Sequence, residues 1–334
     1  MFKRILRHVV RGLILTPIVM ATIAGGILIF TAPKAPPPIK AVQGAVGALT
    51  AFNKELPEYH YLTARDGGQL AYRYYAGKPG GGTAIVVHGS SGWSQASHGI
   101  AKAFAARGIS VYAIDLRGHG LSPGPNGRAG DIVYRGQYED DLDDLAQRVK
   151  REHPGEKRLL VGHSTGGSVI LRTAGSKYAG NFDGYLALSP FIAAGTAMDR
   201  PSEGGWTNVS IPRIVVLTIL NRWGISAFDH LNVLGMAVPK TSDKTRPRFY
   251  THALLASANL PRDWKPALAA IHQPTQVLIG ADDELFHAEA YPAAIEGANP
   301  AIKVTVLPGL GHMAMTYDAR ALTAEADKAV EMLK

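Results

Sequence analysis

The chain contains no cysteine among its 334 residues. This absence excludes disulfide bonds, a thiol nucleophile and any metal site built from thiolates. It assigns no compartment, because a protein exported to an oxidising compartment can fold without disulfides. Hydrophobic residues make up 46% of the sequence, which is typical of a folded protein. The length is sufficient to bury one large core.

Acidic residues are missing from the first 50 positions, which nevertheless hold six lysines and arginines. Most of the formal net charge of +8 therefore belongs to the N-terminus, and the remaining chain has 29 basic and 27 acidic residues. A nearly balanced body lacks the basic surface that nucleic-acid-binding domains use. We therefore expect no nucleic-acid partner.

Charged residues are also absent from Leu13 to Phe30, which follows four basic residues. Such a stretch is close to the roughly 17–20 apolar residues that span a bilayer. The positive-inside rule then predicts a single-pass protein with a cytoplasmic N-terminus and a periplasmic or extracellular body. The alternative is a signal peptide and a secreted protein, although the apolar region of a signal peptide usually has about 7–15 residues.

Three regions are expected along the chain. Residues 1–32 form the membrane anchor or signal segment, and residues 33–56 form a proline-rich linker that begins with an extended spacer. Residues 57–334 form the globular domain. Apolar runs alternate with helical segments through this domain, which predicts a mostly parallel sheet.

Residues 162–166 read Gly-His-Ser-Thr-Gly and follow an apolar run that is typical of a buried strand. A G-x-S-x-G turn between a strand and a helix presents a serine hydroxyl at a strained position and requires small neighbours. The following helix N-terminus aims backbone N–H groups at developing negative charge. Ser164 is therefore the candidate nucleophile.

A serine hydroxyl needs a base, and the base needs an orienting acid. Asp282 and Asp283 follow the apolar run at 275–280, and His312 follows the run at 302–307 after a glycine-rich turn. These groups stand at the carboxyl ends of predicted strands, where catalytic groups of α/β sheets gather. Only one of the two aspartates can be the orienting acid, and whichever is not is an ordinary turn residue.

An oxyanion hole requires backbone donors from the loop after an earlier strand. The apolar run at 84–87 leads into His-Gly-Ser-Ser-Gly at 88–92. The N–H groups of Ser90 and Thr165 are the candidate donors, and a plain Gly/Ser turn is the alternative. We expect His163 and His119 to serve structural roles.

Together these residues resemble the α/β-hydrolase superfamily, and within it the monoacylglycerol lipase and lysophospholipase-like group, also called serine aminopeptidase-type hydrolases. The matching motifs lie at 87–89, 113–122, 162–167, 186–190, 280–283 and 311–312. The resemblance implies an α/β-hydrolase fold, with a mostly parallel sheet flanked by helices and a helical cap inserted at about residues 191–262.

The resemblance also implies residue roles. Ser164 maps onto the nucleophile, Asp283 onto the acid by its spacing from the strand-end glycine, and His312 onto the base. Ser90 and Thr165 map onto the oxyanion donors, and no cofactor or metal is implied. Many monoacylglycerol lipases have a Glu-His pair after the His-Gly, whereas this chain has Ser-Ser-Gly-Trp-Ser at 90–94. That departure weakens the transfer of glyceride specificity.

The expected function is hydrolysis of carboxylic esters, with lipid or acyl esters such as monoacylglycerol or lysophospholipid as substrates. An acyltransferase with the same acyl-enzyme and a small-molecule esterase are the alternatives. A peptidase is less favoured, because we find no acidic cluster in the cap that would hold a substrate amino group. A non-catalytic binding protein on the same fold is a further alternative. The apolar cap segment at 211–220 either packs on the core, lines an acyl-chain pocket or contacts a bilayer.

Overall fold

An eight-stranded sheet forms the centre of the computed structural model, which describes residues 2–39, 55–238 and 245–334, with side chains from Thr16 onward. The strand order is β1-β2-β4-β3-β5-β6-β10-β11. The first two strands, β1 (Tyr59–Thr63) and β2 (Gln69–Tyr75), form an antiparallel hairpin, and β2 pairs antiparallel with β4. The parallel strands are β3 (Thr83–Val87), β4 (Ser110–Ile114), β5 (Arg158–His163), β6 (Gly184–Leu188), β10 (Thr275–Gly280) and β11 (Lys303–Leu307).

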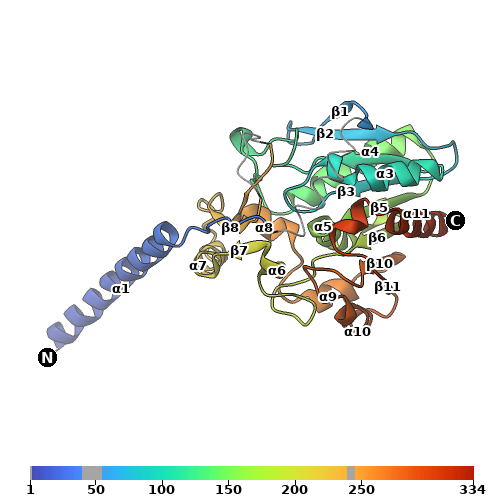
Figure 1. Cartoon of the computed structure of the whole chain (residues 1–334). Helices are drawn as coiled ribbons and strands as arrows, with labels where there is room; N and C mark the ends of the chain where they lie inside the picture. The colour runs from blue at the N-terminus through green and yellow to red at the C-terminus, as the bar shows by residue number, and fades with distance from the viewer. Residues whose placement is uncertain (1, 40–54, 239–244) are drawn as a thin grey trace.

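Both faces of the central strands are buried by helices (Figure 1). Along β3, alternate residues enter different hydrophobic clusters, with Val86 in one and Ile85 in the other, as the two-residue period of a strand requires. One face packs against α3 (His98–Ala106) and α11 (Ala319–Leu333). The other packs against α4 (Gln137–Glu152), α5 (Thr165–Ala174), α9 (Trp264–Ala269) and α10 (Tyr291–Ala298). This arrangement confirms the predicted fold class.

Short 3₁₀ turns connect several of these elements. They are η2 (Ser94–Ser97), η3 (Pro125–Gly127), η4 (Ala179–Asn181), η5 (Ala288–Ala290) and η6 (Met313–Thr316).

The segment between β6 and β10 contains helices and a second sheet. Its helices are α6 (Ser202–Gly205), α7 (Ile211–Arg222) and α8 (His252–Ala258), followed by α9, which packs on the main sheet. The antiparallel strands are β7 (Thr207–Val209), β8 (Asn232–Met236) and β9 (Phe249–Thr251). We call the three strands the cap sheet. The sequence predicts a helical cap and misses this sheet, because strands of three to five residues are too short for a clear alternating pattern.

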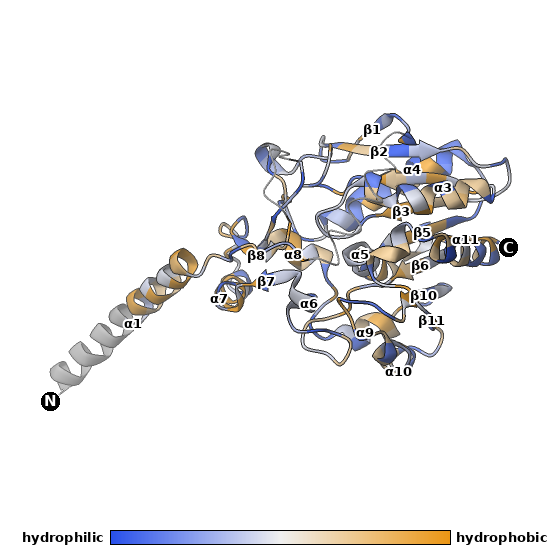
Figure 2. Cartoon of the chain, in the orientation of Figure 1, coloured by the Kyte–Doolittle hydropathy of each residue, from blue (hydrophilic) through white to orange (hydrophobic). Residues whose placement is uncertain are grey.

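Helix α7 packs beside the N-terminal helix α1 (Phe2–Phe30), away from the main core. Its buried Leu217 forms a small cluster with Leu28 and Val233, and the Arg213 guanidinium donates to the Leu28 carbonyl. Figure 2 shows hydrophobic residues along the end of α1 that meets the body. After α1, the Lys34 carbonyl accepts a hydrogen bond from Asn208 Nδ2 at 2.9 Å. Residues 33–39 therefore run along the cap, and the rest of the expected linker up to residue 54 lies outside the described residues.

The prediction of a membrane-spanning segment at residues 13–30 is corrected here. Over the part of the chain with described side chains, the structure contains no helix that is long and apolar enough to cross a membrane. We had predicted from this segment a single-pass topology and a location outside the cytoplasm, anchored or secreted. Both predictions are withdrawn.

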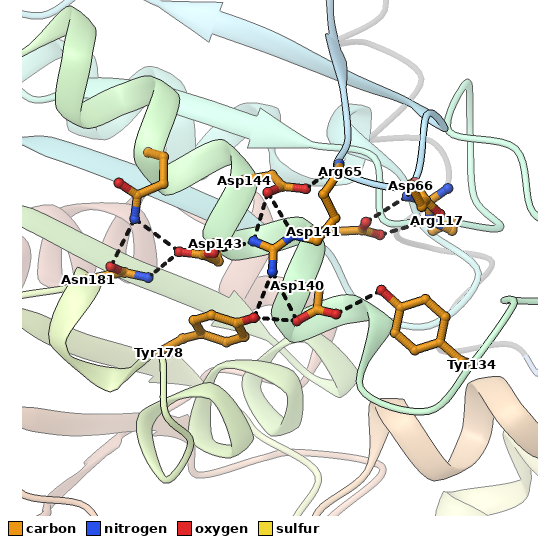
Figure 3. A network of polar contacts seen from close by, with 11 residues as sticks. Arg65, Asp66, Arg117, Tyr134, Asp140, Asp141, Asp143, Asp144, Tyr178 and Asn181 are labelled. Atoms are coloured by element: carbon orange, nitrogen blue, oxygen red, sulfur yellow. Dashed lines mark hydrogen bonds and ion pairs between the residues drawn. The ribbon is translucent and has the colours of Figure 1, made fainter.

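One arginine ties the β1–β2 hairpin to α4 (Figure 3). The Arg65 guanidinium donates to Asp144 at 2.7 Å, to Asp143 and to the Tyr178 hydroxyl at 2.7 Å. Tyr178 also donates to Asp140 at 2.5 Å. The hairpin is thereby fixed across the edge of the sheet, on the side of the molecule where α4 lies.

Candidate active site

The turn after β5 has the geometry that the G-x-S-x-G pattern predicts. Ser164 adopts φ 56° and ψ −121°, and α5 begins at the next residue. A Cβ on Gly162 would lie 2.3 Å from the Gly166 carbonyl oxygen, and a Cβ on Gly166 would lie 2.5 Å from the Val87 carbonyl oxygen. Neither position tolerates a side chain, so the glycines are what allow the strained turn to pack against β3.

Asp283 and His312 are brought together from the ends of β10 and β11. The Asp283 Oδ2 lies 2.8 Å from His312 Nδ1, and both side chains are buried. The other carboxylate oxygen accepts the backbone N–H groups of Leu285 and Phe286, each at 2.9 Å. Asp282 is exposed instead. Of the two candidate acids, the structure therefore brings Asp283 to the histidine.

The ion pair shifts the pKa of each partner. Burial opposes charge on Asp283, yet His312 and the two backbone N–H donors hold the pKa of this carboxyl below its ordinary value. Burial likewise opposes charge on His312, yet Asp283 raises the pKa of the imidazole above its ordinary value. Each group stabilises the charged form of the other, as expected for opposite charges in contact.

A second histidine lies beside the first but in a different state. The rings of His163 and His312 have centroids 4.7 Å apart. Burial, with His312 nearby, lowers the pKa of His163 to about 3. His163 is therefore neutral at ordinary pH, and its Nε2 lies 3.1 Å from the His312 carbonyl oxygen, to which it donates. This contact fits the expected structural role.

Ser164 and His312 line one cavity of about 70 Å³, which Ser90 and two cap residues, Trp206 and Arg246, also border. Because Nδ1 of His312 contacts Asp283, Nε2 is the nitrogen that remains for chemistry in this cavity. The contacts of the described residues include no hydrogen bond from Ser164 to His312. Catalytic hydrogen bonds of this kind often tighten only when substrate is bound.

The loop after β3 approaches the serine closely. A Cβ on Gly89 would lie 3.1 Å from Ser164 Cβ. The Leu116 N–H donates to His88 Nε2 at 3.0 Å, so His88 Nδ1 carries the proton and donates to the Gly89 carbonyl oxygen at 2.8 Å. Because the peptide unit is planar and trans, fixing this carbonyl also fixes the direction of the Ser90 N–H.

The second candidate donor is Thr165. It is the first residue of α5, and the first N–H groups of a helix have no partner within the helix. Thr165 and Ser90 both line a smaller cavity, which Glu203 and Tyr250 of the cap also border. The sequence motifs did not predict Trp206, Glu203 and Tyr250 as residues of the site, because no motif with fixed spacing marks residues of the cap.

A metal site is a separate question. Across residues 2–39, 55–238 and 245–334, no three or more His, Cys, Asp or Glu side chains are grouped so that they could hold a metal ion.

Comparison with known proteins identifies the family. Residues 79–318 match the serine aminopeptidase S33 family. Monoacylglycerol lipase of Mycolicibacterium smegmatis is 30% identical over 113 residues, which are 34% of this chain and 39% of that protein. Human monoglyceride lipase is 29% identical over 137 residues, which are 40% of this chain and 43% of that protein. The chain thus spans less than half the length of these curated relatives.

Solved structures share the fold at low sequence identity. A soluble variant of Saccharomyces cerevisiae monoglyceride lipase has a TM-score of 0.64 and 15% identity, covering 90% of this chain and 98% of that chain. Monoacylglycerol lipase of Paleococcus ferrophilus has a TM-score of 0.56 and 19% identity, covering 79% and 99%. The family match extends over most of the globular domain and confirms the resemblance found in the sequence. The chain belongs to the serine aminopeptidase S33 family of α/β-hydrolases.

Proposed function

We propose that this protein is a serine hydrolase that cleaves carboxylic esters of lipids or other acyl compounds, such as monoacylglycerol or lysophospholipid. The observation that carries the proposal is the buried contact between Asp283 and His312, at a cavity that Ser164 also lines. A histidine that is held by a carboxylate and lies beside a nucleophilic serine is the arrangement that serine hydrolases use on several unrelated folds.

The proposed reaction proceeds through an acyl-enzyme. Ser164 Oγ attacks the ester carbonyl while His312 Nε2 takes the hydroxyl proton, and Asp283 keeps Nδ1–H of His312 oriented. The N–H groups of Ser90 and Thr165 stabilise the negative charge on the carbonyl oxygen. His312 then gives the proton to the leaving alcohol. Water attacks the acyl-enzyme with His312 as base, which releases the acid and restores Ser164.

Two features support an acyl substrate. The relatives described above include proteins named monoacylglycerol lipase and monoglyceride lipase. The small cavity next to the proposed oxyanion donors is bordered by Phe191, Leu234, Met236 and Leu255. An apolar wall at this point suits the hydrocarbon side of an ester carbonyl.

A peptidase is the less favoured reading of the same site. Glu203 of the cap borders the small cavity, where a substrate amino group would require a carboxylate. Burial raises the pKa of Glu203 to about 7, and its Oε1 already accepts a hydrogen bond from Thr207 Oγ1 at 3.1 Å. Burial therefore disfavours the charged form of Glu203 that an ammonium group would need as its partner.

The proposal is tested with the full chain and its Ser164→Ala variant on esters from acetyl to palmitoyl, including monoacylglycerol and lysophospholipid. We expect activity that depends on Ser164 and rises with chain length. Activity only on short esters would indicate a small-molecule esterase, and transfer of the acyl group to an added alcohol or amine would indicate an acyltransferase. No turnover of any ester would contradict the proposal.

A further inference from the structure

Trp206 and two strands of the cap sheet, β8 and β9, contact the two residues that follow Gly89. Trp206, which directly precedes β7, donates from Nε1 to Ser90 Oγ at 2.9 Å. Ser91 Oγ donates to the sulfur of Met236, the last residue of β8, at 3.0 Å. The Ser91 N–H donates to the hydroxyl of Tyr250 in β9 at 3.3 Å. The cap therefore holds side chains and backbone of this loop.

The contact through Tyr250 extends to a second loop with a defined direction. His119 Nδ1 donates to the Arg117 carbonyl oxygen at 3.2 Å, because a carbonyl can only accept, and it therefore carries the ring proton. In the neutral ring His119 Nε2 is then an acceptor, and the Tyr250 hydroxyl donates to it at 2.8 Å. Burial holds the pKa of His119 well below its ordinary value, so the ring remains neutral and can accept from Tyr250.

The loop adopts a backbone conformation that needs outside support. Ser91 has φ 58°, a left-handed conformation that is uncommon for residues other than glycine and costs on the order of 1 kcal/mol or more. On the N-terminal side of Ser90, His88 of the main domain fixes the peptide plane. On its C-terminal side, the Gly92 N–H donates to the Gly89 carbonyl oxygen at 3.1 Å and closes the turn. The other contacts described above come from Trp206 and from strands β8 and β9 of the cap.

From this geometry we propose that Trp206 and Tyr250 are positioning residues for the oxyanion hole. Together with His88, which orients the Gly89–Ser90 peptide, they hold the following residues so that the Ser90 N–H stays directed toward Ser164, although neither supplies the donor itself. The inference rests on the proposed function, because it assigns to the cap a role in the transition state of ester cleavage. It links two segments that lie more than 100 residues apart in sequence.

An oxyanion donor acts mainly on the transition state, so its displacement lowers kcat and leaves KM nearly unchanged. Loss of a whole donor costs about 10²–10³-fold in kcat, and we expect about a tenfold loss when Tyr250→Phe removes only the supporting hydroxyl. The inhibition constant of an alkyl trifluoromethyl ketone should rise by a similar factor, because its serine adduct carries an oxyanion in the hole.

Tyr185→Phe is the matched control. Tyr185 is fully buried, and its hydroxyl donates to the Ala179 carbonyl oxygen at 2.9 Å, with neither residue lining the cavity at Ser164. This variant should lose a comparable amount of thermal stability and retain kcat and the inhibition constant. Equal kinetic losses in both variants would reduce the role of Tyr250 to ordinary stability and overturn the inference.

Ser90→Ala and Trp206→Phe test the same proposal through a different bond. Each breaks the hydrogen bond between the indole and Ser90 Oγ, and Ser90→Ala keeps the backbone donor. We expect both to lower kcat, and the double variant to be no slower than the slower single variant. Unchanged kcat in Ser90→Ala and Tyr250→Phe would overturn the inference while Ser164-dependent hydrolysis by the unmodified chain stands. Absence of that hydrolysis would overturn the proposed function and this inference with it.

Discussion

The loops at the carboxyl ends of the main sheet and the cap sheet contribute to the candidate site in different ways. Ser164, Asp283 and His312 each follow a strand of the main sheet directly or within a few residues. Trp206, which directly precedes β7, and Tyr250 of β9 reach the same site from cap segments that no motif marks. The main sheet positions the groups proposed to react, and the cap supports the loop that faces them.

The largest effect that would sharpen this contrast is expected from the two neighbouring histidines. His312→Asn should lower kcat by about 10⁴–10⁶-fold, as for loss of a base in a serine hydrolase. His163→Asn should cost far less, because the pKa of His163, lowered to about 3 by burial, already prevents it from taking a proton. Steady-state ester hydrolysis measures both. Equal losses would contradict the assignment of the base.

The two adjacent aspartates give the next largest contrast. Asp283→Asn should lower kcat by about 10⁴-fold, since it removes the group that orients and stabilises the imidazolium. Asp282→Asn, at an exposed position, is the matched control and should retain activity. A large loss of kcat in Asp282→Asn with little loss in Asp283→Asn would show that Asp282, not Asp283, is the orienting acid.

The pH profile tests the same pair. Asp283 raises the pKa of His312 above its ordinary value of 6.5, and only the neutral imidazole can take the proton of Ser164. Activity should therefore be lost as the pH falls through a value above 6.5. In Asp283→Asn the residual activity should be lost at a lower pH, because burial still lowers the pKa of His312 and the carboxylate that raised it is gone. An unchanged pH dependence would contradict the pairing of Asp283 with His312.

A smaller effect, on stability alone, is expected on the face of the sheet away from the cap. Glu325 of α11 is fully buried, and neither carboxylate oxygen has a hydrogen-bond partner among the described residues. Burial raises the pKa of Glu325 well above its ordinary value of 4.5. A raised carboxyl pKa means that stability is lost as the pH rises above 4.5, because the unfolded chain releases this proton more readily.

Glu325→Met should therefore stabilise the protein by about 1–3 kcal/mol, the cost of an unpaired buried polar group. The gain should be larger at pH 8 than at pH 4, as followed by chemical denaturation at both values. Glu325→Gln keeps a polar group that does not titrate. The difference in stability between Glu325→Gln and Glu325→Met should therefore be the same at both pH values. Lower stability in Glu325→Met at pH 8 would show that this carboxyl has a partner.

The smallest effect belongs to the hairpin at the far edge of the sheet. Arg65 carries ion pairs to α4 (Figure 3), but its side chain is 38% exposed. Exposed pairs contribute about 0–1 kcal/mol each, so Arg65→Met should lower stability modestly, and less at high salt. Ester hydrolysis should be unchanged. A marked loss of activity in Arg65→Met would show that the hairpin affects the active site, which contradicts a role in stability alone.

Much of the main domain could be predicted because its signals are local. The apolar runs that became β3, β5 and β10 are short and bounded by glycine or polar residues. The turn at Ser164 was marked by glycines at positions where a Cβ would collide with backbone. The pairing of a strand-end aspartate with His312 followed from two neighbouring strand ends, and the family resemblance implied that the aspartate is Asp283.

The cap and the N-terminus could not be predicted in the same way. The roles of Trp206 and Tyr250 depend on contacts with residues more than 100 positions away, which composition and periodicity do not encode. The apolar segment that became α7 was compatible with several environments, and its contacts with Leu28 and Val233 depend on residues that the local pattern does not identify. The predicted membrane span was wrong, because no helix among the described residues is sufficiently long and apolar to cross a bilayer.

The central claim is that Ser164 is a nucleophile activated by His312 and Asp283. It is tested most directly by treating the full chain with a fluorophosphonate and locating the adduct by peptide mass spectrometry. We predict one stoichiometric adduct, on Ser164, that forms at the same rate in Asp282→Asn and is nearly abolished in His312→Asn. An adduct on another serine, or no adduct in the unmodified chain, would contradict the account.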